Sequence, residues 1–304
     1  MIKKFFIVVV LLSNVVFAKQ ITPSEVYGQV MLISKEIHQL LNHFEVDHDH
    51  DGILNRVKIN TKLKPRNVWQ KTYEIMVKIN ILRSEHNLPT IEPVNMTPVL
   101  NLNPDLVYEQ TQRILTEFNI FQHRLGIKQN TFEAKVFKGK TPLDVYIGLS
   151  RISASIDELN KGGVTPSFVF GENIRVYDDI GLILQYLNIA DKTIPAKKNI
   201  KATPNDTFNT GMKILEKIKQ LQIIAGIDFV DFSGFRKENQ TPSEVFSLTQ
   251  MIIAELQTIK AYLGIDTITS AATQYKTKTP VEVDQLMSWN LRKLELINSL
   301  GNRR

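Results

Sequence analysis

The chain has 304 residues, carries a formal net charge of +6 and contains no cysteine. Without cysteine, a disulfide framework, a thiolate metal site and a thiol-linked lipid anchor are all excluded. The charges are spread along the chain and form no basic block interleaved with stacking aromatic residues, so we expect no nucleic-acid partner.

The first eighteen residues have the pattern of a secretory signal. A basic start at Lys3 and Lys4 precedes an apolar run over residues 5–12, and small residues precede a cleavage site after Ala18. The run is too short to cross a bilayer, which requires about 20 apolar residues. We therefore predict that residues 1–18 are a signal peptide and that the mature chain is periplasmic or secreted, without membrane insertion.

The first predicted helix opens at Thr22-Pro23. Threonine suits the N-cap, proline the first helical position and Glu25 the third, where its carboxylate completes a capping box. Counting the proline as zero, side chains recur along one face at +3, +7, +10, +14, +17 and +21, namely Val26, Val30, Ile33, Ile37, Leu40 and Phe44. Alternating steps of four and three are typical of helices that pack in a bundle.

The linker after this helix contains three aspartates at alternate positions. The stretch from Asp47 to Asn55 resembles the first nine positions of the EF-hand calcium loop, with a glycine at the sixth position for the sharp turn. The resemblance implies calcium ligands from the side chains or the backbone of Asp47, Asp49, Asp51, Ile53 and Asn55. This is the candidate metal site of the sequence.

The resemblance covers only about ten residues. Lys58 stands at the twelfth position, where the family has a bidentate glutamate, so we expect weak binding, toward the roughly millimolar range of extracellular modules. An acidic turn with solvated charges is one alternative. A transition-metal site is another, because four histidines lie nearby at His38, His43, His48 and His50.

The same helix start recurs through the rest of the chain. It appears at Lys64-Pro65, Asn103-Pro104, Thr141-Pro142, Thr165-Pro166, Thr203-Pro204, Thr241-Pro242 and Thr279-Pro280. Successive prolines are 42, 39, 38, 24, 38, 38 and 38 residues apart. The spacing predicts an all-α protein made of eight single-helix repeats of about 38 residues.

The predicted helix ends follow one pattern. A glycine or asparagine able to adopt the left-handed conformation is followed by an apolar residue that can fold back on the helix. These residues are Asn87, Gly126, Asn188, Gly226 and Gly264. The capping motif at the start, the apolar face and the residue at the end together predict helices of about 22 residues.

The short interval of 24 residues divides the array. We predict two four-helix bundle-like units, residues 20–162 and 163–304, joined near Gly162-Gly163. Several linkers cover fifteen residue steps, which can span about 50 Å when extended. They are long enough to return along a helix, which would leave neighbouring helices parallel; an antiparallel bundle with long packed loops is the alternative.

Two columns of the repeat are chemically unusual. Position +4 is aromatic in every repeat except the last, which has Asp284, and we interpret the aromatics as closing the end of the core, with sugar or peptide stacking as the alternative. Position +7 is less apolar in four repeats, at Thr72, Thr111, Asn173 and Gly211. A void there would favour a ligand pocket, and a filled layer would favour a scaffold.

No catalytic motif stands out, and we expect no enzyme. The sequence lacks a phosphate-binding glycine loop, a nucleophile elbow and a cysteine nucleophile. We expect an exported interaction scaffold for a protein or an envelope polymer, with calcium fixing the first linker. The alternative is a small-molecule sensor or carrier with a pocket inside one bundle.

Overall fold

The computed structural model describes residues 20–46, 61–128, 132–133, 135–161, 163–235 and 239–300. Over these residues the chain forms eight α-helices, each opening at one of the repeated prolines. They are α1 (Pro23–His43), α3 (Pro65–Glu85), α4 (Pro104–Arg124), α5 (Pro142–Leu159), α6 (Pro166–Tyr186), α7 (Pro204–Ala225), α8 (Pro242–Leu263) and α9 (Pro280–Glu295). The all-α class and the regular spacing of about 38 residues are confirmed.

The helix starts have the predicted capping geometry. The N-cap backbone N–H donates to the carboxylate three residues later in α1, α5, α7, α8 and α9, for example from Thr22 to Glu25 at 2.8 Å and from Thr203 to Asp206 at 2.8 Å. Each such bond satisfies a backbone donor at the helix start and places a negative charge at the positive end of the helix dipole.

The helix ends are also as predicted. Asn87, Gly126, Asn188, Gly226 and Gly264 all have positive φ, between 56° and 78°. The following N–H then reaches back to a carbonyl in the last turn, as from Ile227 to Gln222 at 2.8 Å and from Ile265 to Lys260 at 2.9 Å. These bonds satisfy carbonyls that would otherwise lack a partner.

The helices form two groups of four, α1, α3, α4 and α5 in the first unit and α6, α7, α8 and α9 in the second. In each unit the four opening prolines and the residues three positions later meet at one end of the bundle. All four helices of a unit are therefore parallel. Of the two topologies that the linkers allow, the one with extended returns is present.

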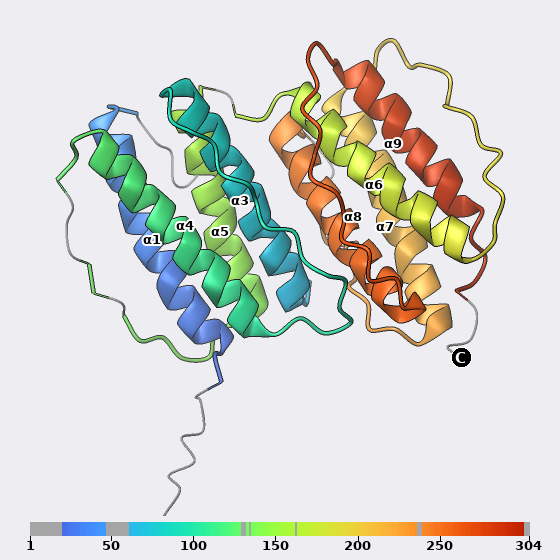
Figure 1. The fold of residues 1–304 in the computed structure, drawn as a ribbon, viewed down its shortest axis with the longest axis horizontal. Helices are drawn as coiled ribbons and strands as arrows, with labels where there is room; N and C mark the ends of the chain where they lie inside the picture. The colour runs from blue at the N-terminus through green and yellow to red at the C-terminus, as the bar shows by residue number, and fades with distance from the viewer. Residues whose placement is uncertain are drawn as a thin grey trace, which may run out of the picture.

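The return linkers run back along helices of their own unit. The α4–α5 linker lies along α1, where Phe137 contacts the ring of Tyr27 at 5.0 Å and Phe132 lies under Lys35. The α6–α7 linker lies along α9, where Thr193 accepts a hydrogen bond from Trp289. The linkers thus form an outer layer on the bundles (Figure 1).

The two units pack side by side through α3 and α8, which lie at the centre of the molecule (Figure 1). The start of α3 meets the later part of α8 at Arg66 and Glu255, and the later part of α3 meets the start of α8 at Lys78 and Ser243. The two helices therefore cross antiparallel, and so do the two units. Over the described residues, no helix has the length and apolarity required to cross a membrane.

Candidate functional site

The predicted calcium ligands Asp47, Asp49, Asp51, Ile53 and Asn55 lie outside the described residues. Within the described ranges, the structure brings together no group of three or more side chains that could hold a metal ion. The calcium loop therefore stays a prediction.

The aromatic column at +4 has the packing role that the sequence favours. Trp69, Tyr146, Phe208 and Phe246 are buried, each with at most 3% of its surface exposed. In the first helix of each unit the +4 ring packs on a return linker instead, Tyr27 on Phe137 at 5.0 Å and Phe170 on Tyr275 at 4.9 Å. These six rings are covered by the protein itself, which leaves little of them for stacking on a ligand.

The contact between α1 and its linker is repeated in the second unit. Ser24 accepts a hydrogen bond from the backbone of Lys140 at 3.1 Å, and the ammonium of Lys140 lies 4.5 Å from the ring centre of Tyr27. On α6, Ser167 accepts from Lys278 at 3.0 Å, and Lys278 lies 4.5 Å from the ring of Phe170. The two units therefore hold equivalent linkers in the same way.

The less apolar layer at +7 is filled. Thr72 and Thr111 turn their hydroxyls onto backbone carbonyls of their own helices, those of Trp69 at 2.6 Å and Tyr108 at 2.7 Å. At Gly211, an added Cβ would lie only 2.6 Å from a methyl carbon of Leu248. At Gly211 the missing side chain accommodates Leu248, which favours a packed layer over a ligand pocket there.

A collection of buried charge lies between the two units. Lys71 donates to Glu74 at 2.7 Å and to Ser247 of the other unit at 3.0 Å. Lys78 contacts Asp157 at 2.6 Å. Burial raises the pKa of Glu74, but the ammonium groups of Lys71 and Lys78 outweigh burial and hold that pKa below its ordinary value.

A second buried pair lies at the other end of α3. The guanidinium of Arg66 contacts both carboxylate oxygens of Glu255 at 3.0 Å, a bidentate geometry that restricts both side chains. The same carboxylate accepts from Asn67 at 2.8 Å and from Gln222 at 2.9 Å. Glu255 thereby connects α3, α7 and α8.

Arg175 completes this junction from α6. It pairs with Glu172 at 2.5 Å, donates to Asn95 in the linker of the first unit at 2.8 Å, and lies 4.5 Å from the ring of Tyr73 on α3. The Glu172 carboxylate raises the pKa of Arg175 against the effect of burial. Only 1% of the Arg175 surface is exposed. These charges are paired and enclosed, so their geometry supports a role in joining the units.

The described residues also form a groove between α7 and its own return linker. Its volume is about 380 Å³, and its lining combines apolar and charged side chains: Asn209, Met212, Lys213, Leu215, Glu216, Lys219, Val230, Phe232 and Ser233. The size lies within the usual range of about 300–1,000 Å³ for ligand sites.

The two units differ at one position beside this groove. In α3, fifteen residues after the opening proline, Asn80 accepts from the backbone N–H of Ile91 at 2.8 Å and donates to its carbonyl at 2.5 Å. The equivalent residue of α7 is Lys219, which contacts the side chain of Asp231 at 3.4 Å. Lys219 thus pairs with a side chain of the linker, where Asn80 pairs with the linker backbone, and Lys219 is one of the residues that line the groove.

Sequence reasoning missed both the junction and the groove. Lys71, Glu74 and Lys78 lie to one side of the apolar seam of α3, where charged residues ordinarily indicate solvent. At the groove, the aligned repeats differ in sequence, with Lys219 of α7 at the position that Asn80 has in α3. Comparisons with protein-family models, with curated proteins and with solved structures found no match.

Proposed function

We propose that the protein is an exported, non-catalytic interaction protein that binds an extended segment of a partner protein in the α7 groove. The observation that carries this proposal is the composition of the groove, which has an apolar floor of Met212, Leu215, Val230 and Phe232 beneath a charged rim. Apolar side chains of a partner can be buried on such a floor, while the rim fixes the partner's orientation.

The rest of the described structure supports binding over catalysis. The buried charges at the junction are paired with one another, and the filled layer at Gly211 favours a scaffold over a carrier with a pocket inside the bundle. A carrier of small molecules remains the second candidate, favoured by the groove volume of about 380 Å³.

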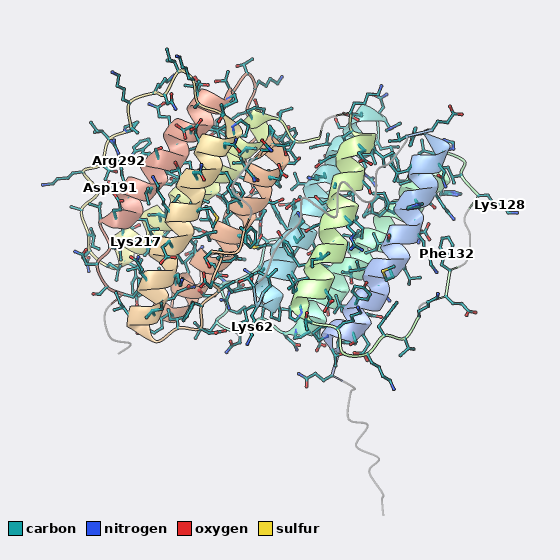
Figure 2. All side chains as sticks on the ribbon, turned by 180° about the vertical axis from the view of Figure 1, so that it is seen from behind. Lys62, Lys128, Phe132, Asp191, Lys217 and Arg292 are labelled. Carbon is teal, nitrogen blue, oxygen red and sulfur yellow. The ribbon has the colours of Figure 1, made fainter. Side chains whose placement is uncertain are left out.

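Site-specific photo-crosslinking tests the proposal. A photoreactive residue replaces Lys213 at the groove rim and, as the control, Lys128 at the opposite edge of the molecule (Figure 2). We expect an adduct of protein mass from position 213 alone. Equal adducts from both positions, or none from position 213, would contradict the proposal.

A companion variant shows whether the adduct depends on the groove floor. Met212→Glu places a carboxylate in the floor and should remove the adduct, whereas Leu106→Glu, at a side chain of α4 that is 37% exposed, should leave it. Native mass spectrometry of the purified protein distinguishes the second candidate, because a carrier would retain a small molecule that Met212→Glu loses.

We also propose that calcium orders the first linker through the loop from Asp47 to Asn55. Binding to the folded state alone raises the melting temperature in proportion to the logarithm of calcium concentration above the dissociation constant. Calcium should therefore raise the midpoint of the wild-type protein and not that of Asp49→Ala. Equal shifts in both proteins would leave the loop as an acidic turn.

A further inference from the structure

The α6–α7 return linker presents lysines and isoleucines together. Residues 191–201 contain four lysines and one aspartate, a net charge of +3. Lys192, Lys197, Lys198 and Lys201 are all exposed. Ile194 and Ile200 are 71% and 82% exposed, more than any other described large apolar side chain except Val136. We call residues 191–201 the basic strap.

The basic strap is held on α9 through its backbone. Gln285 donates to the carbonyl of Ala196 at 2.7 Å, and Arg292 donates to the carbonyl of Ile194 at 3.3 Å. Trp289 donates to the hydroxyl of Thr193 at 2.9 Å. Because these three contacts use the backbone and one small hydroxyl, both isoleucine side chains remain available to a partner, and so do the lysines other than Lys198, which pairs with Glu282.

The basic strap also lies at an accessible place. Asp191 and Arg292 are at the outer edge of the second unit, away from the junction (Figure 2). Opposing charge is limited there. Asp191 contacts Lys293 of α9 at 3.4 Å, and Glu282 contacts Lys198 at 3.1 Å. Lys192, Lys197 and Lys201 have no acidic partner among the ion pairs of the described residues.

We propose that the basic strap docks the protein peripherally on a bilayer containing anionic lipids. Lysines near an anionic membrane each contribute favourable electrostatic energy that salt screens. Exposed isoleucines add a contribution only where there is an apolar phase to enter, which a bilayer interface provides. A soluble acidic polysaccharide would attract the lysines but would leave both isoleucine side chains exposed to water. The proposal does not depend on the α7 groove.

Vesicle co-sedimentation of the full chain tests this proposal. The protein should sediment with vesicles of phosphatidylglycerol and phosphatidylcholine, and not with phosphatidylcholine alone, and added salt should release it. Ile194→Asn with Ile200→Asn should lower the partition coefficient by about tenfold or more. Lys197→Gln with Lys201→Gln should do the same, because each lysine near the surface contributes about a factor of five.

Matched variants separate the basic strap from general surface effects. Ile224→Asn with Ile268→Asn removes two exposed isoleucines of the same unit outside the strap, and Lys62→Gln with Lys276→Gln removes two exposed lysines elsewhere. Both controls should bind as wild type does. Circular dichroism checks that every variant is folded.

Three outcomes would overturn the proposal. One is equal binding to neutral and anionic vesicles. Another is equal loss in the strap variants and their matched controls. The third is full binding by the isoleucine variant when the lysine variant binds less, since the strap would then bind through charge alone, without the apolar contact that distinguishes a bilayer from a soluble polyanion.

Discussion

At the scale of single residues, the junction depends on buried charges that compensate one another. Glu74 is fully buried between Lys71 and Lys78 and also accepts a hydrogen bond from Ser153 at 2.6 Å. Removing one member leaves the others buried and uncompensated, which costs more free energy than the complete network contributes.

Glu74→Ala should therefore lower the free energy of unfolding by about 3–5 kcal/mol. Glu216→Ala is the control, because Glu216 pairs with Lys219 at the surface, where its side chain is 53% exposed and such pairs contribute about 0–1 kcal/mol. Urea unfolding measures both. Similar losses in the two variants would show that the junction charges are not energetically coupled.

The lowered pKa of the Glu74 carboxyl determines how the stability of the fold changes with pH. Because the pKa of Glu74 is lowered in the folded state from its ordinary value of 4.5, the stability it contributes is fully present above pH 4.5. That stability is lost as the pH falls through the lowered folded-state value. Glu74→Gln should accordingly flatten the acid side of the stability profile.

At the scale of elements, the helices and their caps were predictable because their signals are local. Thr22, Glu25 and Gly226 lie within a few residues of the groups they satisfy, so sequence alone identifies them. The direction of each helix was not predictable in this way. The linkers are long enough for either topology, and the choice depends on contacts such as that of Phe137 with Tyr27.

A glycine shows how closely these linkers approach the helices. A Cβ added to Gly171 on α6 would lie against the backbone carbonyl of Thr273 in the α8–α9 linker. A Cβ added to Gly181 on the same helix would meet, outside its own helix, only the end of the Lys293 side chain within 4 Å. Gly28 on α1 lies in the same way against the carbonyl of Lys135.

Gly171→Ala should therefore destabilise the protein by about 1–3 kcal/mol, because its methyl group displaces a backbone that cannot yield easily. Gly181→Ala should instead stabilise the protein by about 0.5–1 kcal/mol, because alanine favours the helix. Thermal unfolding distinguishes the two. Stabilisation by both changes would show that the linker moves freely on α6.

At the scale of the whole molecule, burial of α3 and α8 depends on the partner unit. The run Met251-Ile252-Ile253-Ala254 in α8 is apolar on all sides, which indicates a central helix. The matching face of α3 is polar, with Lys71 and Glu74, and gives no such signal. The burial of α8 was therefore predictable from its sequence, whereas the burial of the polar face of α3 became evident only from the arrangement of the two units.

The junction should make the two units unfold together. The two tryptophans report separately, Trp69 in α3 of the first unit and Trp289 in α9 of the second. In the single-tryptophan variants Trp69→Phe and Trp289→Phe, the fluorescence and circular dichroism midpoints in urea should coincide, since separating the units would expose unpaired Arg66 and Glu255. Clearly different midpoints for the two reporters would contradict this expectation.

The parallel direction of the helices within each unit has an electrostatic consequence. Each helix dipole is equivalent to roughly half an elementary charge at each end of the helix. Four aligned helices therefore place roughly two positive charges at the N-terminal end of a bundle and roughly two negative charges at its C-terminal end. Because the two bundles point in opposite directions, their macroscopic moments largely cancel in the intact molecule. A half expressed alone would keep its full moment, and its solubility and orientation in an electric field would differ from those of the whole.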